Sequence, residues 1–77
     1  MSKNFEIVAE IIEDVADISR DEINMDSSLM DDLELSSLEL MTIFSDISRK
    51  TSIPISNKDI LAFETVADIV AVLDAHS

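Results

Sequence analysis

The apolar residues near the start of the chain recur every three or four positions, at Phe5, Val8, Ile12 and Val15. This spacing places them on one face of an α-helix, while most of the acidic side chains between them fall on the other face. The pattern therefore predicts an amphipathic helix over about Phe5 to Val15, with Ser2 as its cap.

The stretch from about Asp17 to Ser36 has no sustained period and is rich in Asp, Asn and Ser. These residues bond to their own backbone and favour turns. We expect a long loop that is anchored in the core by Ile23, Leu29 and Leu33. Such a length is typical of a functional loop or of a long crossing between helices.

A second helix is predicted to begin at Ser36 or Ser37. Ser36 and Glu39 have the S-x-x-E spacing of a capping box. Acidic residues precede this start and basic residues follow near Lys50, as the helix dipole favours. Pro54 stands beyond the expected end of the helix.

The remaining segment predicts a short helix within Ile55 to Phe63, capped by Ser56 or Asn57, and a last helix capped by Thr65. The apolar stripe of the last helix consists of Val66, Ile69, Val70 and Leu73. We therefore expect an all-α fold over residues 1–77, a small four-helix bundle of three main helices and one short helix with a long first loop.

The second helix has a core face and an unusual outer face. At 100° per residue, its core face consists of Leu40, Ile43, Phe44 and Ile47. Leu38 falls on the opposite, polar side and is predicted to be exposed, and Met41 falls at the edge of that side. A single exposed leucine is ordinary, whereas an apolar centre with a charged rim is typical of a docking patch.

Ser37 stands beside the predicted start of this helix. A serine there usually caps the helix, but Ser36 already fits the cap by its spacing to Glu39. The hydroxyl of Ser37 would then be free, at a helix end that favours a bound phosphate. A covalent modification of Ser37 is compatible with this position, but the periodicity of apolar residues alone does not identify the attached group.

Composition narrows the classes of function. The 77 residues suffice for one small domain, and 17 acidic against 5 basic side chains give a net charge of −12. This charge disfavours nucleic acid and anionic lipid, and it suits a basic protein partner or simple solubility. The longest apolar run, Ile69 to Leu73, is too short for membrane insertion, and no signal peptide is present, so we expect a cytoplasmic protein.

The chain offers little for catalysis or for metal binding. It has no cysteine, which excludes disulfides and thiolate metal sites. A serine nucleophile needs an adjacent base, and the only histidine is His76, one residue from the end. The acidic loop lacks the glycine of a calcium-binding EF-hand. We expect no enzyme, no catalytic residue and no metal site.

Three segments together resemble a known family. The run from Asp32 to Met41, DLELSSLELM, is similar to the carrier-protein signature D-L-G-x-D-S-L followed by an acidic, apolar helix. The run from Asp21 to Leu29 is similar to the loop before that signature, and the run from Phe63 to Ile69 to the start of the final helix. By this resemblance the chain is identified as a member of the acyl carrier protein family.

The resemblance implies that Ser37 receives 4′-phosphopantetheine from coenzyme A, through a Mg²⁺-dependent phosphopantetheinyl transferase. The thiol of the arm would then carry an acyl cargo as a thioester between enzymes of fatty acid, polyketide or related biosynthesis. The implied partners are loading, condensing and acyl-transfer enzymes with basic docking surfaces. The protein itself is expected to be a monomer. The matching contact positions are Leu38, Glu39, Met41 and Asp46.

In many stand-alone relatives the cargo folds back between the second and third helices. The apolar residues that would line such a groove here are Met41, Phe44, Ile55, Ile60 and Leu61. These residues could equally do no more than fill the core.

Two positions depart from the family pattern. Ser36 replaces the usual aspartate, which removes a carboxylate that a transferase could recognise and leaves Ser36 as an alternative attachment site. Glu34 replaces a glycine, so it is strained if the loop needs a positive φ. These departures suggest a specialised carrier. An aminoacyl or peptidyl carrier, and an unmodified docking module, remain the alternatives.

Overall fold

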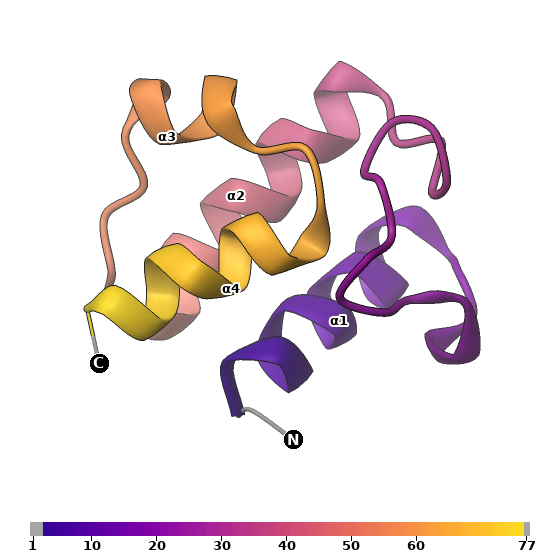
Figure 1. Ribbon diagram of the computed structural model, residues 1–77, viewed down its shortest axis with the longest axis horizontal. Coiled ribbons are helices and arrows are strands. Elements are labelled where there is room, and N and C mark those ends of the chain that lie inside the picture. Colours follow the sequence, from indigo (N-terminus) through magenta and orange to yellow (C-terminus); the bar gives the residue numbers. More distant parts are fainter. Residues whose placement is uncertain (1–2, 77) are drawn as a thin grey trace.

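The computed structural model describes residues 3–76, which fold into helices joined by loops (Figure 1). The helices are α1 (Lys3–Ala16), the short 3₁₀ helix η1 (Arg20–Glu22), α2 (Ser37–Thr51), α3 (Asn57–Ala62) and α4 (Val66–Ala75). No strand occurs among the residues described, and the predicted all-α bundle with a long first loop is confirmed. The predicted cap, Ser2, lies outside the described residues.

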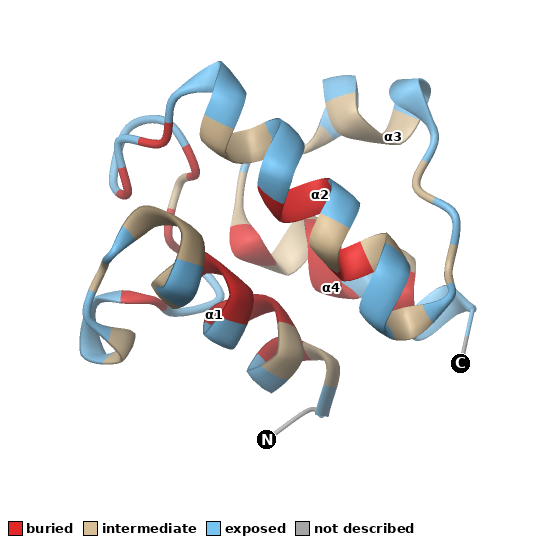
Figure 2. Cartoon of the chain, turned by 180° about the vertical axis from the view of Figure 1, so that it is seen from behind, coloured by how far each residue is buried: buried red, intermediate tan, exposed pale blue. Residues whose placement is uncertain are grey.

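The core is built from the faces that α1, α2 and α4 turn toward one another (Figure 2). Its fully buried aliphatic side chains include Ile12 of α1, Ile43 and Ile47 of α2, and Ile69 and Leu73 of α4. The apolar stripe predicted for the last helix is buried throughout. The stripes predicted for the first and second helices are buried except for Val15 and Leu40, which are half-buried.

Local hydrogen bonds fix where the two later helices begin. Ser56 caps α3, since its Oγ accepts from the Asp59 N–H at 3.1 Å, while the Asp59 carboxylate accepts from the Ser56 N–H at 3.3 Å. Thr65 occupies the cap position of α4 as predicted. One Asp68 carboxylate oxygen there accepts from the N–H groups of Glu64 at 2.8 Å and Thr65 at 3.1 Å. These hydrogen bonds to the charged form lower the pKa of Asp68.

The loop over residues 17–36 is irregular but well anchored. Ile23, Leu29 and Leu33 are buried as predicted. Leu35 is buried as well, which the sequence pattern did not indicate. The buried Ser27 is satisfied, since its Oγ accepts from the Asn24 N–H at 3.1 Å and donates to the Glu22 carbonyl at 3.4 Å. The loop therefore contributes to the core instead of covering it loosely.

Backbone hydrogen bonds fasten this loop to the start of α4. An isolated antiparallel bridge pairs Ser28 with Thr65. The three bonds at this junction are Leu29 N–H to the Glu64 carbonyl at 2.9 Å, Val66 N–H to the Ser27 carbonyl at 3.1 Å, and Ala67 N–H to the Met25 carbonyl at 3.0 Å. The junction fixes the path by which the loop reaches the start of α2.

Over residues 3–76, no helix is both long enough and apolar enough to cross a bilayer.

Candidate functional site

The start of α2 is closed by the capping box that the sequence predicts. The Ser36 Oγ accepts from the Glu39 N–H at 3.2 Å, and the Glu39 carboxylate accepts from the Ser36 N–H at 2.9 Å. The hydroxyl and the N–H group of Ser36 are thereby both committed to the cap. Such a cap contributes about 1 kcal/mol to helix stability.

Ser37 is the first residue of α2 and is exposed. Within residues 3–76 its hydroxyl makes no hydrogen bond, in contrast to the hydroxyl of Ser36. The N–H groups of a first helical turn have no preceding helical carbonyl to bind, and the helix dipole makes this end positive. An exposed, unbonded hydroxyl at such an end fits a covalently attached phosphate group.

The backbone just before this site is in the left-handed region. Glu34 has φ of 52°, and its side chain is exposed. The loop does need the conformation that a glycine would adopt without strain, so the conditional prediction about Glu34 is confirmed. A side chain at such a φ costs about 1 kcal/mol or more.

Large exposed apolar side chains occur in the first two turns of α2 and in the loop before it. Leu38 is 76% exposed, as predicted, and Met41, which the helical wheel places at the edge of the polar side, is 67% exposed. Met30, in the preceding loop, is 63% exposed. The sequence analysis missed Met30, because an irregular loop has no periodicity that assigns a residue to a face. Isolated exposed side chains are ordinary, but large apolar side chains exposed on one helix, such as Leu38 and Met41, are compatible with a docking surface.

The acidic residues predicted as partner contacts differ in their surroundings. Glu39 is half-buried and holds the cap of α2. Asp46 is half-buried, and its carboxylate pairs with the Arg49 guanidinium at 2.8 Å. Neither carboxylate is therefore a free charge, and a partner would meet each one together with its bound neighbour.

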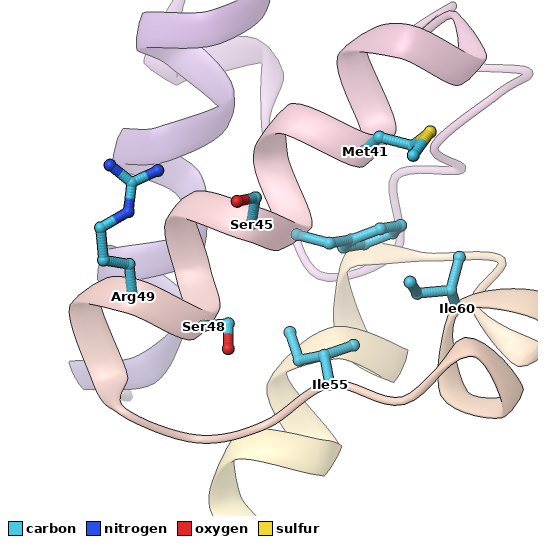
Figure 3. A pocket seen from close by; sticks show the side chains of 7 residues that line it. Met41, Ser45, Ser48, Arg49, Ile55 and Ile60 are labelled. Atoms are coloured by element: carbon cyan, nitrogen blue, oxygen red, sulfur yellow. The ribbon is translucent and has the colours of Figure 1, made fainter.

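A groove of about 410 Å³ lies between α2 and the segment that carries α3 (Figure 3). Four of the five residues proposed for such a groove line it: Met41, Phe44, Ile55 and Ile60. The Phe44 ring also packs against the Phe63 ring, with centroids 5.3 Å apart. Leu61 is 87% exposed and does not line the groove, so its assignment is corrected. In the six-residue α3, Ile60 faces the groove and the next residue turns away from it.

Three polar residues of α2 also line the groove: Ser45, Ser48 and Arg49. None of these three residues was predicted to line the groove. The groove runs along the boundary between the core face and the outer face of α2, so residues of both classes border it. A signal was available in the sequence, because Ser45 and Ser48 are one helical turn from Met41 and Phe44.

The possible metal ligands and the histidine of the chain were weighed in the sequence as candidates for chemistry. Among the described residues, no group of three His, Asp or Glu side chains is arranged to hold a metal ion. The Nδ1 atom of His76 lies 3.0 Å from the Val72 carbonyl oxygen of its own helix. The ring of His76 therefore has a polar contact within α4.

Comparison with known proteins agrees with this geometry. Residues 6–73 match the family model described as "Phosphopantetheine attachment site". The chain is 32% identical over 73 residues to an acyl carrier protein of Clostridium perfringens, an alignment that covers 95% of this chain and 96% of the relative. It is 36% identical over 69 residues to an acyl carrier protein of Rhodococcus erythropolis, covering 86% and 76% of the two chains.

A third relative has a more specialised name. The chain is 38% identical over 64 residues to a meromycolate extension acyl carrier protein of Mycobacterium bovis, covering 83% of this chain and 56% of that one.

Proposed function

The chain belongs to the acyl carrier protein family, whose members bear covalent 4′-phosphopantetheine, and we propose that Ser37 is the residue that bears it here. One observation carries this proposal above all. Ser37 is exposed and its hydroxyl is unbonded within the described residues, while the adjacent Ser36 is committed to the helix cap at 3.2 Å.

The cap also argues against attachment at Ser36. A phosphodiester on the Ser36 Oγ would place a bulky anion where the Glu39 N–H now donates. The Glu39 carboxylate lies on the Ser36 N–H and would repel that anion. Attachment at Ser37 leaves both cap hydrogen bonds in place and puts the phosphate at the positive end of α2.

The arm, when bound, supplies a thiol that holds an acyl cargo as a thioester between enzymes of fatty acid, polyketide or related biosynthesis. The chain's own residues orient the attachment point and present contact surfaces, and the chain catalyses no reaction. An acyl cargo is favoured over an aminoacyl or peptidyl one because the three relatives described above are named acyl carrier proteins.

Partner enzymes are proposed to dock on the outer side of α2. Leu38 and Met41 offer apolar contacts there, and Glu39 and Asp46 belong to the acidic rim. The net charge of −12 favours partners with basic surfaces, including the phosphopantetheinyl transferase. We expect association that weakens as salt rises, because exposed charges are screened. We propose further that the protein acts as a monomer in the cytoplasm.

Intact mass spectrometry tests the attachment. The apo protein is incubated with coenzyme A, Mg²⁺ and a broad-specificity phosphopantetheinyl transferase, and the modified peptide is then mapped. We expect the gain of one phosphopantetheine, lost in Ser37→Ala and retained in Ser36→Ala. Circular dichroism of each variant confirms that it is folded. A gain that survives in Ser37→Ala, or that maps to Ser36, would overturn the assignment.

A further inference from the structure

The groove beside α3 has two chemically different kinds of lining residue. Ile55 and Ile60 lie on one side of the groove, and Met41 lies at its end nearer the start of α2 (Figure 3). Phe44 is a further apolar lining residue. Ser45 and Ser48 are polar lining residues from α2, and the Ser45 hydroxyl is turned away from Ile55 and Ile60 in Figure 3. A groove shaped only for saturated hydrocarbon would not have serines among its lining residues.

The two serine hydroxyls differ from the two threonine hydroxyls of α2. The Thr42 Oγ1 donates to the Leu38 carbonyl at 3.1 Å, and the Thr51 Oγ1 donates to the Ile47 carbonyl at 2.7 Å. Within residues 3–76, the Ser45 and Ser48 side chains make no hydrogen bond at all, although a helical serine often bonds back in the same way. Both hydroxyls are thus available to a bound molecule.

This availability has opposite consequences for two kinds of cargo. A saturated acyl chain laid along the groove would displace water from the half-buried Ser48 without offering it a partner, which costs free energy. A chain that carries a hydroxyl or keto oxygen can accept a hydrogen bond from the same serine. The apolar lining residues would contact the carbon skeleton equally well in both cases.

Arg49 argues against a third kind of cargo, one that ends in a carboxylate. Its guanidinium already pairs with Asp46 at 2.8 Å. Its side chain extends away from Ile55 and Ile60, toward α1 (Figure 3), where it borders a second hollow together with Ile11. The groove therefore offers neutral donors to the cargo and no free cation.

We propose that Ser48, assisted by Ser45, makes the groove selective for acyl chains that bear a hydroxyl or keto oxygen over saturated chains of equal length. This inference rests on the proposed function, since the cargo reaches the groove from Ser37. The two serines act as specificity-determining residues, and the apolar lining residues set the orientation of the chain.

The first test compares thermal unfolding of the loaded protein. The chain is loaded with octanoyl groups or with each positional isomer of hydroxyoctanoyl, loading is verified by intact mass, and the midpoint is followed by circular dichroism. One additional hydrogen bond predicts that the best hydroxylated cargo raises the midpoint by about 4 °C more than octanoyl does.

Variants assign this difference to the groove. Ser48→Ala should abolish it and Ser45→Ala should reduce it. Thr42→Ala is the matched control, because it removes a hydroxyl of the same helix that does not line the groove and should leave the difference intact. Equal shifts for saturated and hydroxylated cargo in the unaltered chain, or a difference that survives in the Ser45→Ala/Ser48→Ala double variant, would overturn the proposal.

A second arm of the experiment separates this inference from the proposed function. Octanoyl-pantetheine and its hydroxylated analogues are titrated as free ligands into the apo protein, and backbone amide shifts are followed by NMR. Larger shifts at Ser45 and Ser48 for the hydroxylated ligand support groove selectivity even if Ser37 proves not to be the attachment site. Successful loading at Ser37 with no such preference would overturn the selectivity alone.

Discussion

Residues 17–36 and residues 52–65 both connect long helices, yet only the first of these connections contains residues that are fully buried in the core. The first contains only the 3₁₀ helix η1 as regular structure, and it buries Ile23, Leu29, Leu33 and Leu35. The second contains α3 and has no fully buried residue. Regular secondary structure is thus a poor guide to how tightly a segment is held, because burial of apolar surface supplies most of the free energy.

This difference bears on how a cargo reaches the groove. Ile55 and Ile60, which line one wall, belong to the connection that buries least. A segment with few buried contacts opens at a low cost in free energy compared with the core. We expect the α3 side of the groove to move while α2 and the first connection keep Ser37 in place.

Truncation of one aliphatic side chain in each connection gives the largest expected effect. Leu29→Ala should lower the free energy of unfolding by about 3 kcal/mol, because Leu29 is 2% exposed. Ile60→Ala should lower it by about 1 kcal/mol, because Ile60 is only partly buried. Urea unfolding followed by circular dichroism measures both. Equal losses would contradict the contrast between the connections.

The strained residue of the first connection gives the next largest effect, in the opposite direction. Glu34→Gly should raise the free energy of unfolding by about 1 kcal/mol, because glycine adopts φ of 52° without a steric cost. Glu34→Ala is the control, since it removes the charge but keeps the β-carbon. If the alanine variant gains as much as the glycine variant, the gain comes from charge and not from backbone strain.

The carboxylate at the end of the second connection predicts a pH-dependent effect. The Glu64 and Thr65 N–H groups lower the pKa of Asp68 in the folded chain. The contribution of the Asp68 carboxylate to the free energy of unfolding is therefore present above the unfolded pKa of about 4, and it is lost as pH falls through the pKa of the folded state. Asp68→Asn should therefore lower the free energy of unfolding by just under ~1 kcal/mol at pH 7.

The difference between the wild type and Asp68→Asn should shrink below about pH 4. Chemical unfolding at a series of pH values measures it. Asp26→Asn is the control for net charge, because the Asp26 carboxylate has no hydrogen bond among the residues described. A difference between wild type and Asp68→Asn that stays constant down to pH 2 would rule out the charge as its source.

The cap of α3 gives the smallest expected effect on global stability. Ser56→Ala should lower the free energy of unfolding by about 0.5 kcal/mol or less, while Ser36→Ala, which removes the same kind of cap from α2, should lower it by about 1 kcal/mol. Hydrogen exchange should quicken at the α3 amides alone in Ser56→Ala. Exchange that quickens throughout the chain would show α3 to be coupled to the core.

The features that the sequence predicted are those specified by nearby residues. The cap of Ser36, the exposure of Leu38 and the buried stripe of α4 each follow from spacings of three or four positions. The bridge between Ser28 and Thr65 depends on a partner far along the chain, which periodicity cannot identify, and Leu35 is buried within a segment that has no periodic pattern.

The candidate site likewise has features that nearby residues specify and features that depend on distant residues. The exposed position of Ser37 could be predicted from the cap beside it. The lining of the groove could be predicted only in part, because the groove is bordered by residues from both the core face and the outer face of α2.

The junction of the two connections has a consequence for the order of events during synthesis. Each bond of this junction joins the first connection to the segment at the start of α4. The N–H donors are those of Leu29, Val66 and Ala67. A growing chain that has passed Ser37 but not yet residues 64–67 lacks all three of these bonds, so the loop before Ser37 cannot yet hold its final path. An enzyme that recognises this loop together with the start of α2 would therefore distinguish a nascent chain from a completed one.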